Sequence, residues 1–207
     1  MSWKSWQFGK PDSSAYKVYD WLRNGINRKL VQRLLNHLVQ KDTPDLRIKT
    51  LEAGSGPAYA SSLISNSSYV QMSVAVDLDT QALKEARKRD SQLPVVAADI
   101  HHLPFPSNTF QLAWNSSTLE HIDPPGPVVA EMSRVLTVNG TIFIGVPFAG
   151  GPLGFQRWIR TTRFGNWIGS VYRKENVVLL LKQFQFKTFK HIYYFGYFFV
   201  GVFGERQ

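Results

Sequence analysis

The chain lacks cysteine, and its 207 residues contain no long uncharged apolar segment. Without cysteine, disulfides, thiolate metal sites and a cysteine nucleophile are excluded, and the composition is typical of a reducing compartment. The longest uncharged apolar stretch, residues 192–204, is shorter than the about 20 residues that a membrane-spanning helix needs. The first residues also lack the apolar run of a signal peptide. We therefore expect a cytoplasmic protein without a transmembrane helix.

Two common catalytic signatures are also missing. The Gly-x-Ser-x-Gly segment that carries the nucleophile of many hydrolases does not occur in the sequence. The histidine, aspartate and glutamate residues form no cluster with the spacing of metal ligands. These absences argue against a Ser-His-Asp hydrolase, and we expect no metal.

Acidic residues are scarce at both ends of the chain. Residues 1–50 carry ten Lys/Arg and four Asp/Glu, residues 51–150 carry five and nine, and residues 151–207 carry nine and two. The net charge of +9 is therefore divided into +6, −4 and +7 along the chain. Basic surfaces attract phosphate, nucleic acid or anionic lipid, although they can also serve only to keep a protein soluble.

From residue 47 onward, short apolar segments alternate with helix-forming segments. Strands are expected at residues 48–53, 72–77, 94–98, 110–115, 141–146, 186–194 and 197–203. Helices are expected at residues 16–39, 58–64, 80–89, 128–136 and 173–182. An Asn139-Gly140 turn should precede the fifth strand, and Gly196 should join the last two. This alternation is typical of right-handed βαβ units on a mainly parallel sheet.

Acidic residues stand at the carboxyl ends of the first three predicted strands. Glu52 leads into the flexible Gly54-Ser55-Gly56 turn, and Asp77 and Asp99 end the second and third strands. A carboxylate in the second position can accept two hydrogen bonds from ribose, and one in the third can accept from an exocyclic amine. No Lys or Arg lies in the first loop, so a cationic nucleoside fits better than a dinucleotide. Asp77 or Asp99 alone could equally cap a helix or lie on the surface, and the glycines alone could form a tight turn.

The order and spacing of these residues resemble those of the class I S-adenosylmethionine-dependent methyltransferases. The resemblance is to the small-domain group that includes the ubiquinone and menaquinone biosynthesis methyltransferases. It covers roughly residues 48–147. The segments similar to the family's motifs are residues 51–56, 76–79, 98–106, 110–112, 119–122 and 135–141.

This resemblance implies a fold and a cofactor. The fold is α/β and Rossmann-like, with a mainly parallel seven-stranded sheet, helices on both faces and an antiparallel C-terminal strand. The cofactor is S-adenosylmethionine. The residues expected to bind it are Glu52, Gly54, Ser55, Gly56, Pro57, Asp77, Leu78, Asp99, Ile100, Asn115 and Ser116.

Two residues depart from the family's pattern. Ala58 stands where a third glycine usually falls, and Gln111 stands where an aspartate is common. Because alanine is small, we expect the cofactor loop to remain intact.

Methyl transfer from a sulfonium is an in-line displacement that depends mainly on aligning the reactants. A general base is needed only where the nucleophile carries a proton of high pKa. His121 is the best-placed candidate, with a structural role as the alternative. Tyr19 lies in a segment similar to the family's N-terminal Tyr-Asp pair and is expected near the cofactor, or else in the core. His101 and His102 follow Asp99 and could edge the adenine pocket or lie on the surface.

The methyl acceptor is expected to bind at the two basic ends of the chain. Arg157, Trp158 and Arg160 are the predicted acceptor-binding residues, in a stretch that interleaves cations with aromatic rings. Such a stretch can bind a phosphate and a ring, anionic lipid or RNA bases, or it can pack on the core with solvated arginines. The aromatic run at residues 193–203 suggests peripheral contact with a membrane surface, or two buried strands.

The sequence thus predicts a methyltransferase that acts on a small or lipid-like, amphiphilic metabolite. Nucleic acid ranks below such an acceptor because no dedicated RNA-binding module is present. The alternative is an RNA methyltransferase, or a non-catalytic nucleic-acid-binding protein with this fold. One domain, residues 1–207, is expected. Its predicted parts are a helical cap (1–45), a cofactor-binding core (46–148), a basic aromatic lid (149–170) and a C-terminal helix with strands (171–207).

Overall fold

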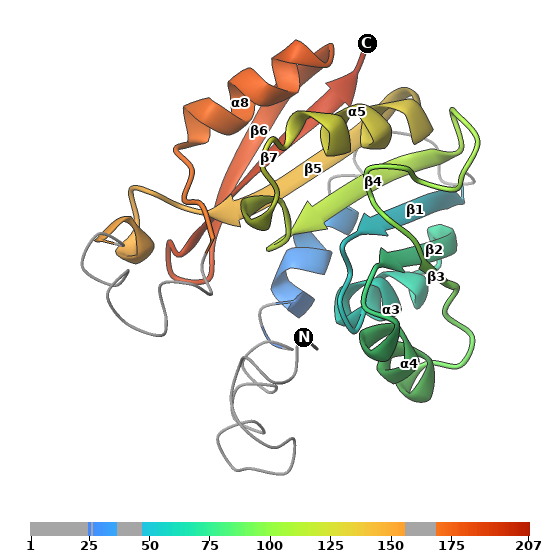
Figure 1. Cartoon of the computed structure of the whole chain (residues 1–207). Helices are drawn as coiled ribbons and strands as arrows, with labels where there is room; N and C mark the ends of the chain where they lie inside the picture. Colours follow the sequence, from blue (N-terminus) through green and yellow to red (C-terminus); the bar gives the residue numbers. More distant parts are fainter. Residues whose placement is uncertain (1–24, 26, 37–46, 156–168) are drawn as a thin grey trace, which may run out of the picture.

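A computed structural model of the chain describes residue 25 and residues 27–36, 47–155 and 169–207 (Figure 1). Tyr19, Arg157, Trp158 and Arg160 lie outside the described residues, as do most of the helical cap and most of the basic aromatic lid. The predictions on those residues therefore stay predictions.

The described residues form one seven-stranded sheet. Its strands lie in the order β3-β2-β1-β4-β5-β7-β6. The strands are β1 (Ile48–Ala53), β2 (Val70–Asp77), β3 (Val95–Ala97), β4 (Phe110–Ser116), β5 (Leu136–Pro147), β6 (Phe186–Tyr194) and β7 (Phe199–Arg206). Strands β1 to β5 pair in parallel, whereas β7 is antiparallel to both β5 and β6. The predicted mainly parallel sheet with an antiparallel C-terminal strand is confirmed.

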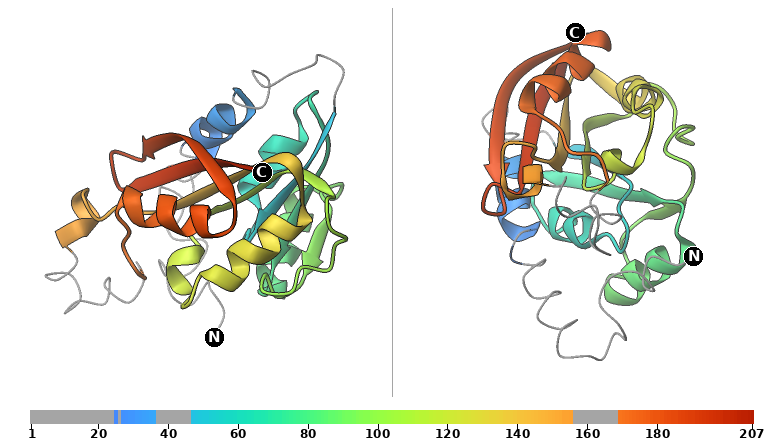
Figure 2. Two further views of the ribbon diagram at one scale, coloured as in Figure 1. Left: turned by 90° about the horizontal axis from the view of Figure 1, so that it is seen from above. Right: turned by 60° about the vertical axis from the view of Figure 1, so that its left-hand side comes forward.

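Helices cover both faces of this sheet (Figure 2). The helical segments are α3 (Tyr59–Ser65), α4 (Thr80–Arg89), η1 (Leu119–His121), α5 (Gly126–Val135), η2 (Pro152–Phe155) and α8 (Lys174–Gln183), together with a helix over residues 27–36. Apolar residues of α5 and α8 pack on one face, and those of α3 and the helix 27–36 pack on the other. The central strands β1, β4 and β5 are therefore buried from both sides, as βαβ crossovers require.

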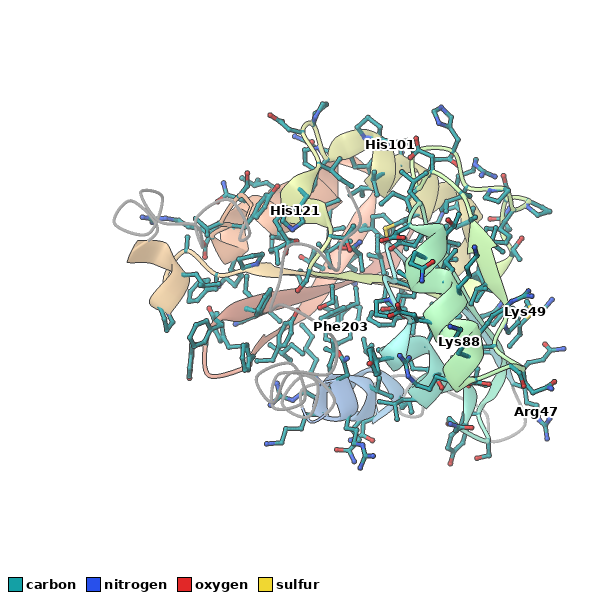
Figure 3. All side chains as sticks on the ribbon, turned by 60° about the horizontal axis from the view of Figure 1, so that its bottom comes forward. Arg47, Lys49, Lys88, His101, His121 and Phe203 are labelled. Carbon is teal, nitrogen blue, oxygen red and sulfur yellow. The ribbon has the colours of Figure 1, made fainter. Side chains whose placement is uncertain are left out.

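The central strands show why the sequence folds in this way. Strand β4 is apolar along most of its length, and its Leu112, Ala113 and Trp114 side chains are buried on alternating faces of the sheet. Each fully buried large apolar side chain stabilises the fold by about 1.5–3 kcal/mol. Phe203 of β7 lies on the face of the helix 27–36, whereas His101 and His121 lie on the opposite side (Figure 3).

The start of β5 differs from the prediction. The strand begins at Leu136, directly after α5, and not after an Asn139-Gly140 turn. Asn139 adopts a left-handed φ of 61°, and the pairing of β4 with β5 shifts register over the same stretch. The Asn-Gly pair therefore interrupts the register inside the strand, because Leu136 already pairs with Phe110.

Two further boundaries also differ. Strand β3 has only three residues, and β7 begins at Phe199 because Phe195, Gly196 and Tyr197 all have positive φ values and form the turn. The arrowheads of β1, β4 and β5 point to the same side in Figure 1. The loops after these strands therefore gather along one edge of the sheet, where open α/β sheets bind ligands.

Candidate functional site

The turn after β1 is held against the loop after β4. The Gly54 and Ser55 N–H groups donate to the Val76 carbonyl at 2.8 and 2.9 Å, and the Thr118 hydroxyl donates to the Gly54 carbonyl at 2.8 Å. Gly54 has a φ of 76°, and a Cβ added there would lie 2.3 Å from Thr118 Cγ2. Only glycine fits this close approach.

Asp77 holds the same turn from the end of β2. Its carboxylate accepts hydrogen bonds from the Gly56 N–H at 2.6 Å and from the Asp79 N–H at 2.8 Å. A carboxylate has about four acceptor positions, so two remain for the hydroxyls of a ribose. The space beside Gly56 is open, because no atom lies within 4 Å of a Cβ built there. Loop and carboxylate together form an open cradle with the shape and acceptors that a nucleoside would need.

Glu52 has a role that the sequence did not predict. Its Oε2 atom accepts hydrogen bonds from the Ser61 N–H at 3.1 Å and the Ser61 hydroxyl at 2.5 Å, in the first turn of α3. The buried carboxylate thereby ties β1 to the helix that follows the loop. A carboxylate near a helix N-terminus is favourable because it satisfies free N–H groups there.

Ala58 replaces glycine in a left-handed conformation. It is fully buried, with φ 50° and ψ 39°, and it precedes α3. This conformation costs about 1–2 kcal/mol for a residue with a Cβ. The neighbouring Pro57 is also buried, and its carbonyl accepts a hydrogen bond from Arg89 Nη1 at 2.8 Å. The Gln111 side chain accepts from the Lys49 N–H at 2.8 Å.

Leu78, Asp99 and Ile100 offer groups that suit an adenine ring. Leu78 follows Asp77 with 68% of its surface exposed, whereas Ile100 is buried. Asp99 Oδ1 accepts from the His101 N–H at 2.9 Å and lies 2.7 Å from His101 Nδ1. The backbone bond, and then the side-chain bond, lower the pKa of Asp99. An exposed apolar side chain and an ionised carboxylate are what a flat ring with an amino group needs.

Asn115 and Ser116 support the site from β4. Asn115 is fully buried, donates from Nδ2 to the Ala53 carbonyl at 2.6 Å and accepts from the Leu119 N–H at 3.3 Å. It therefore joins the end of β1 to η1. The Ser116 hydroxyl lies 2.9 Å from the Tyr194 hydroxyl.

Tyr194 reaches Ser116 by crossing β5. A Cβ added at Gly145 of β5 would lie 2.2 Å from the Tyr194 hydroxyl oxygen, so glycine is required there. Gly145 pairs with Ser116 on one side and with Gly201 on the other. Sequence analysis missed Tyr194, and no local pattern could have revealed a contact between residues this far apart.

Glu120 and His121 are neighbours in η1 with opposite environments. Glu120 is 5% exposed, and burial raises the pKa of its carboxyl to about 8. His121 is exposed, although enough protein surrounds its ring to lower the pKa of the imidazole. A Cβ added at Gly169 would lie 2.8 Å from His121 Nδ1, so the backbone that leads to α8 runs beside the ring. Sequence analysis chose His121 and overlooked Glu120.

Metal ligands do not gather at this edge. Within residues 47–155, 169–207 and the described part of the first helix, no group of three or more His, Asp or Glu side chains could hold a metal ion. In the same part of the chain, no helix is both long and apolar enough to span a membrane.

The fold and the site define the class of protein: a Rossmann-like domain with an acidic nucleoside cradle at its carboxyl edge. A family model described as "Methyltransferase domain" matches residues 51–144. That match covers the loop after β1 and the whole of β2, β3 and β4. It leaves out only the first three residues of β1 and the last three of β5.

Curated relatives and solved structures agree with this match. A Mycobacterium tuberculosis protein named as a probable S-adenosylmethionine-dependent methyltransferase is 28% identical over 61% of this chain and 42% of its own length. The malonyl-[acyl-carrier protein] O-methyltransferase of Laribacter hongkongensis is 32% identical over 45% of this chain and 35% of its own length. The chain therefore spans less than half the length of these two relatives.

One solved structure with the same fold is a Burkholderia thailandensis 1,6-didemethyltoxoflavin-N1-methyltransferase, with bound 1,6-didemethyltoxoflavin and S-adenosylhomocysteine. It superposes with a TM-score of 0.69 at 18% identity and covers 90% of this chain and 80% of its own. This chain carries a class I S-adenosylmethionine-dependent methyltransferase domain. S-adenosylmethionine is the cofactor of that family of enzymes.

Proposed function

We propose that this protein transfers the methyl group of S-adenosylmethionine to a small or amphiphilic metabolite. The observation that supports this most directly is the cradle formed by Gly54, Gly56 and Asp77. Its glycine loop is open beside Gly56, and its carboxylate retains acceptor positions after holding the loop. The small-molecule acceptor in the name of one structural neighbour, 1,6-didemethyltoxoflavin, favours the same substrate class.

The residues present fit this cofactor. Asp77 would bind the ribose hydroxyls, Leu78 and Ile100 would contact the adenine ring, and Asp99 would accept from its amino group. S-adenosylmethionine supplies an electrophilic methyl group on a sulfonium. The chain contributes alignment, because Asp77 and Thr118 hold the loop and Glu52 ties β1 to α3 behind it.

The aromatic run near the C-terminus supports an amphiphilic acceptor. Val200, Val202 and Phe203 are buried in β7, whereas Phe195 and Tyr197 at the turn are 43% and 61% exposed. The run thus supplies one buried strand, β7, and, at its turn, an exposed aromatic tip. Exposed aromatic side chains suit the boundary of a lipid headgroup layer. Contact of this tip with a membrane surface is part of the proposal, as is acceptor binding by Arg157, Trp158 and Arg160.

The cofactor part is tested by calorimetry with S-adenosylhomocysteine, followed by transfer of labelled methyl to fractionated metabolites. Micromolar binding, with label appearing in a metabolite fraction, supports the proposal. Absence of S-adenosylhomocysteine binding would contradict the proposed function. If label enters RNA, and RNA binding weakens steeply with salt, the RNA methyltransferase alternative holds instead.

The membrane part is tested by co-sedimentation with phosphatidylserine vesicles at low and moderate salt. We expect the wild type to sediment and the double variant Phe195→Ser/Tyr197→Ser to remain in the supernatant. Leu179→Ser is the matched control, because Leu179 is an exposed apolar residue on α8, away from the turn. Wild-type protein that stays in the supernatant would favour a soluble acceptor.

A further inference from the structure

Glu120 is a buried acid whose carboxyl is not fully paired. Only 5% of its surface is exposed, and its Oε2 atom has no hydrogen-bond partner among the described residues. Burying a polar group without a partner is unfavourable because its hydration is lost and not replaced. A group retained at such a cost in a ligand-binding region is typical of a functional residue.

Two tyrosines interact electrostatically with this carboxyl, Tyr172 before α8 and Tyr194 at the end of β6. His121, the next residue of η1, is exposed, whereas Glu120 is buried. Burial raises the pKa of each tyrosine, and the negative charge of Glu120 raises it further; Asp123 also contributes at Tyr172. Among the described residues, no lysine or arginine offsets the charge of Glu120, and burial raises its pKa more than a hydrogen bond to its own backbone lowers it.

The position of Glu120 joins it to the cofactor loop. Thr118, two residues earlier, donates a hydrogen bond to the Gly54 carbonyl. On the other side, the Glu120 carbonyl accepts from the Ser170 N–H at 2.9 Å. The turn that carries the acid is therefore held between the cofactor loop and the segment leading to α8. His121, in the same turn, lies on the α5 side of the sheet, as does His101 after β3 (Figure 3).

We propose that Glu120 accepts a proton from the atom that is methylated, and that the methyl acceptor is therefore an amine, an alcohol or a phenol. This inference rests on the proposed methyltransferase function. The acceptor nitrogen or oxygen forms a bond to the methyl carbon, and the carbon–sulfur bond breaks with its electron pair kept by sulfur. The proton that the acceptor loses moves to Glu120 Oε2.

The environment of Glu120 suits this task. With a pKa of about 8, the carboxyl changes between its charged and neutral forms near neutral pH, where a proton acceptor works best. A carboxylate acceptor, by contrast, has no proton to lose on methylation. It would also be repelled by the ionised form of Glu120.

Accessibility of Glu120 is tested without any acceptor. Dicyclohexylcarbodiimide, which reacts with protonated carboxyls in apolar surroundings, is applied to the full chain, and the modified peptide is identified by mass spectrometry. We expect Glu120 to be labelled, with a yield that falls around pH 8. Glu175→Gln is the matched control, because Glu175 is an exposed acid of α8 and its loss should leave this labelling unchanged. An unmodified Glu120 would overturn the inference.

Turnover is tested with three probes: histamine as an amine, catechol as a phenol and malonyl-pantetheine as a carboxylate. We expect labelled methyl on histamine or catechol, a fall of roughly 100-fold or more in Glu120→Gln, and partial recovery in Glu120→Asp. The wild-type kcat/KM should rise with pH up to about 8, and Glu120→Gln should lack this rise. Label on malonyl-pantetheine alone, or wild-type turnover in Glu120→Gln, would overturn the inference. Where none of the probes is labelled, the carbodiimide result decides whether the inference about Glu120 stands.

Binding of S-adenosylhomocysteine separates this inference from the proposed function. If Glu120→Gln binds it as the wild type does but turnover is unchanged, only the role of Glu120 is wrong. If the wild type does not bind it, the proposed function itself is wrong.

Discussion

Asp77 and Glu120 stand at the same edge of one sheet, yet their carboxyls have opposite environments. Asp77 accepts two backbone N–H groups and remains partly open to solvent. Glu120 is buried, and its Oε2 has no partner among residues 47–155 and 169–207. Hydrogen bonds to a carboxylate favour its charged form, whereas burial without them favours the neutral form. One half of the edge therefore presents a carboxyl held by backbone N–H groups, and the other half presents a buried carboxyl whose pKa is raised.

The largest expected effect concerns stability as a function of pH. The pKa of Glu120 in the folded protein, about 8, lies above the ordinary value of 4.5, so the folded protein keeps a proton that the unfolded chain loses between these pH values. Stability should therefore fall as pH rises from about 4.5 to about 8. The contribution of Glu120 is at most about 1.4 kcal/mol per pH unit.

Glu120→Gln should lack this contribution and should gain stability relative to the wild type as pH rises from 5 to 8.5. Urea unfolding at several pH values, without ligand, measures the difference. Glu175→Gln serves as the control and should follow the wild type. Identical slopes for the wild type and Glu120→Gln would show that Glu120 titrates normally, and the contrast with Asp77 would disappear.

A second prediction concerns the cofactor half. Gly54→Ala should destabilise the protein by about 2–4 kcal/mol, because alanine is unfavourable at φ 76° and its Cβ would overlap Thr118. Thermal unfolding and S-adenosylhomocysteine binding should both weaken. Gly56→Ala is the control for space: its φ is also positive, but nothing lies within 4 Å of the added Cβ. Equal losses of stability in the two variants would mean that the Thr118 contact is unimportant.

A third prediction concerns the Asp77 carboxylate that holds the glycine loop. Asp77→Ala should weaken S-adenosylhomocysteine binding by about 1–3 kcal/mol through lost hydrogen bonds to ribose, with further loosening of the loop at Gly56. Asp77→Asn keeps one acceptor oxygen, so its affinity for S-adenosylhomocysteine should lie between those of the wild type and Asp77→Ala. Calorimetry that finds unchanged affinity in Asp77→Ala would remove this residue from the site.

The smallest effect concerns the tyrosine that crosses β5. Tyr194→Phe should lose about 0.5–1.5 kcal/mol of stability, because the Ser116 hydroxyl loses its partner at 2.9 Å. Tyr197→Phe is the control, since Tyr197 is exposed at the turn and its change should be within experimental error. A double-mutant cycle of Tyr194→Phe with Ser116→Ala isolates the bond, and zero coupling would show that it contributes nothing.

Most of the fold was predictable because its signals are local. The apolar period of two in β2, the helix-forming run of α4 and the alternation of strands with helices each depend on a few neighbouring residues. The predicted start of β5 was wrong because Leu136 pairs with Phe110, which lies 26 residues earlier. This pairing extends the strand through Asn139-Gly140, which therefore does not form a turn before it. Strand β3 was predicted too long because an edge strand ends where its neighbour stops pairing with it.

The sequence alone was enough to propose the cofactor half of the site. Gly54, Gly56, Asp77 and Asp99 follow strands directly, and parallel strands bring such ends to one edge whatever the remaining details. Only the tertiary structure decided the state of each acid. The Glu52 carboxylate accepts a hydrogen bond from the Ser61 hydroxyl. Glu120 lies near Tyr172 and Tyr194, which are 50 or more residues further along the chain. Burial and pairing, which set whether a carboxyl keeps its proton, depend on those distant residues and not on the motif that contains the acid.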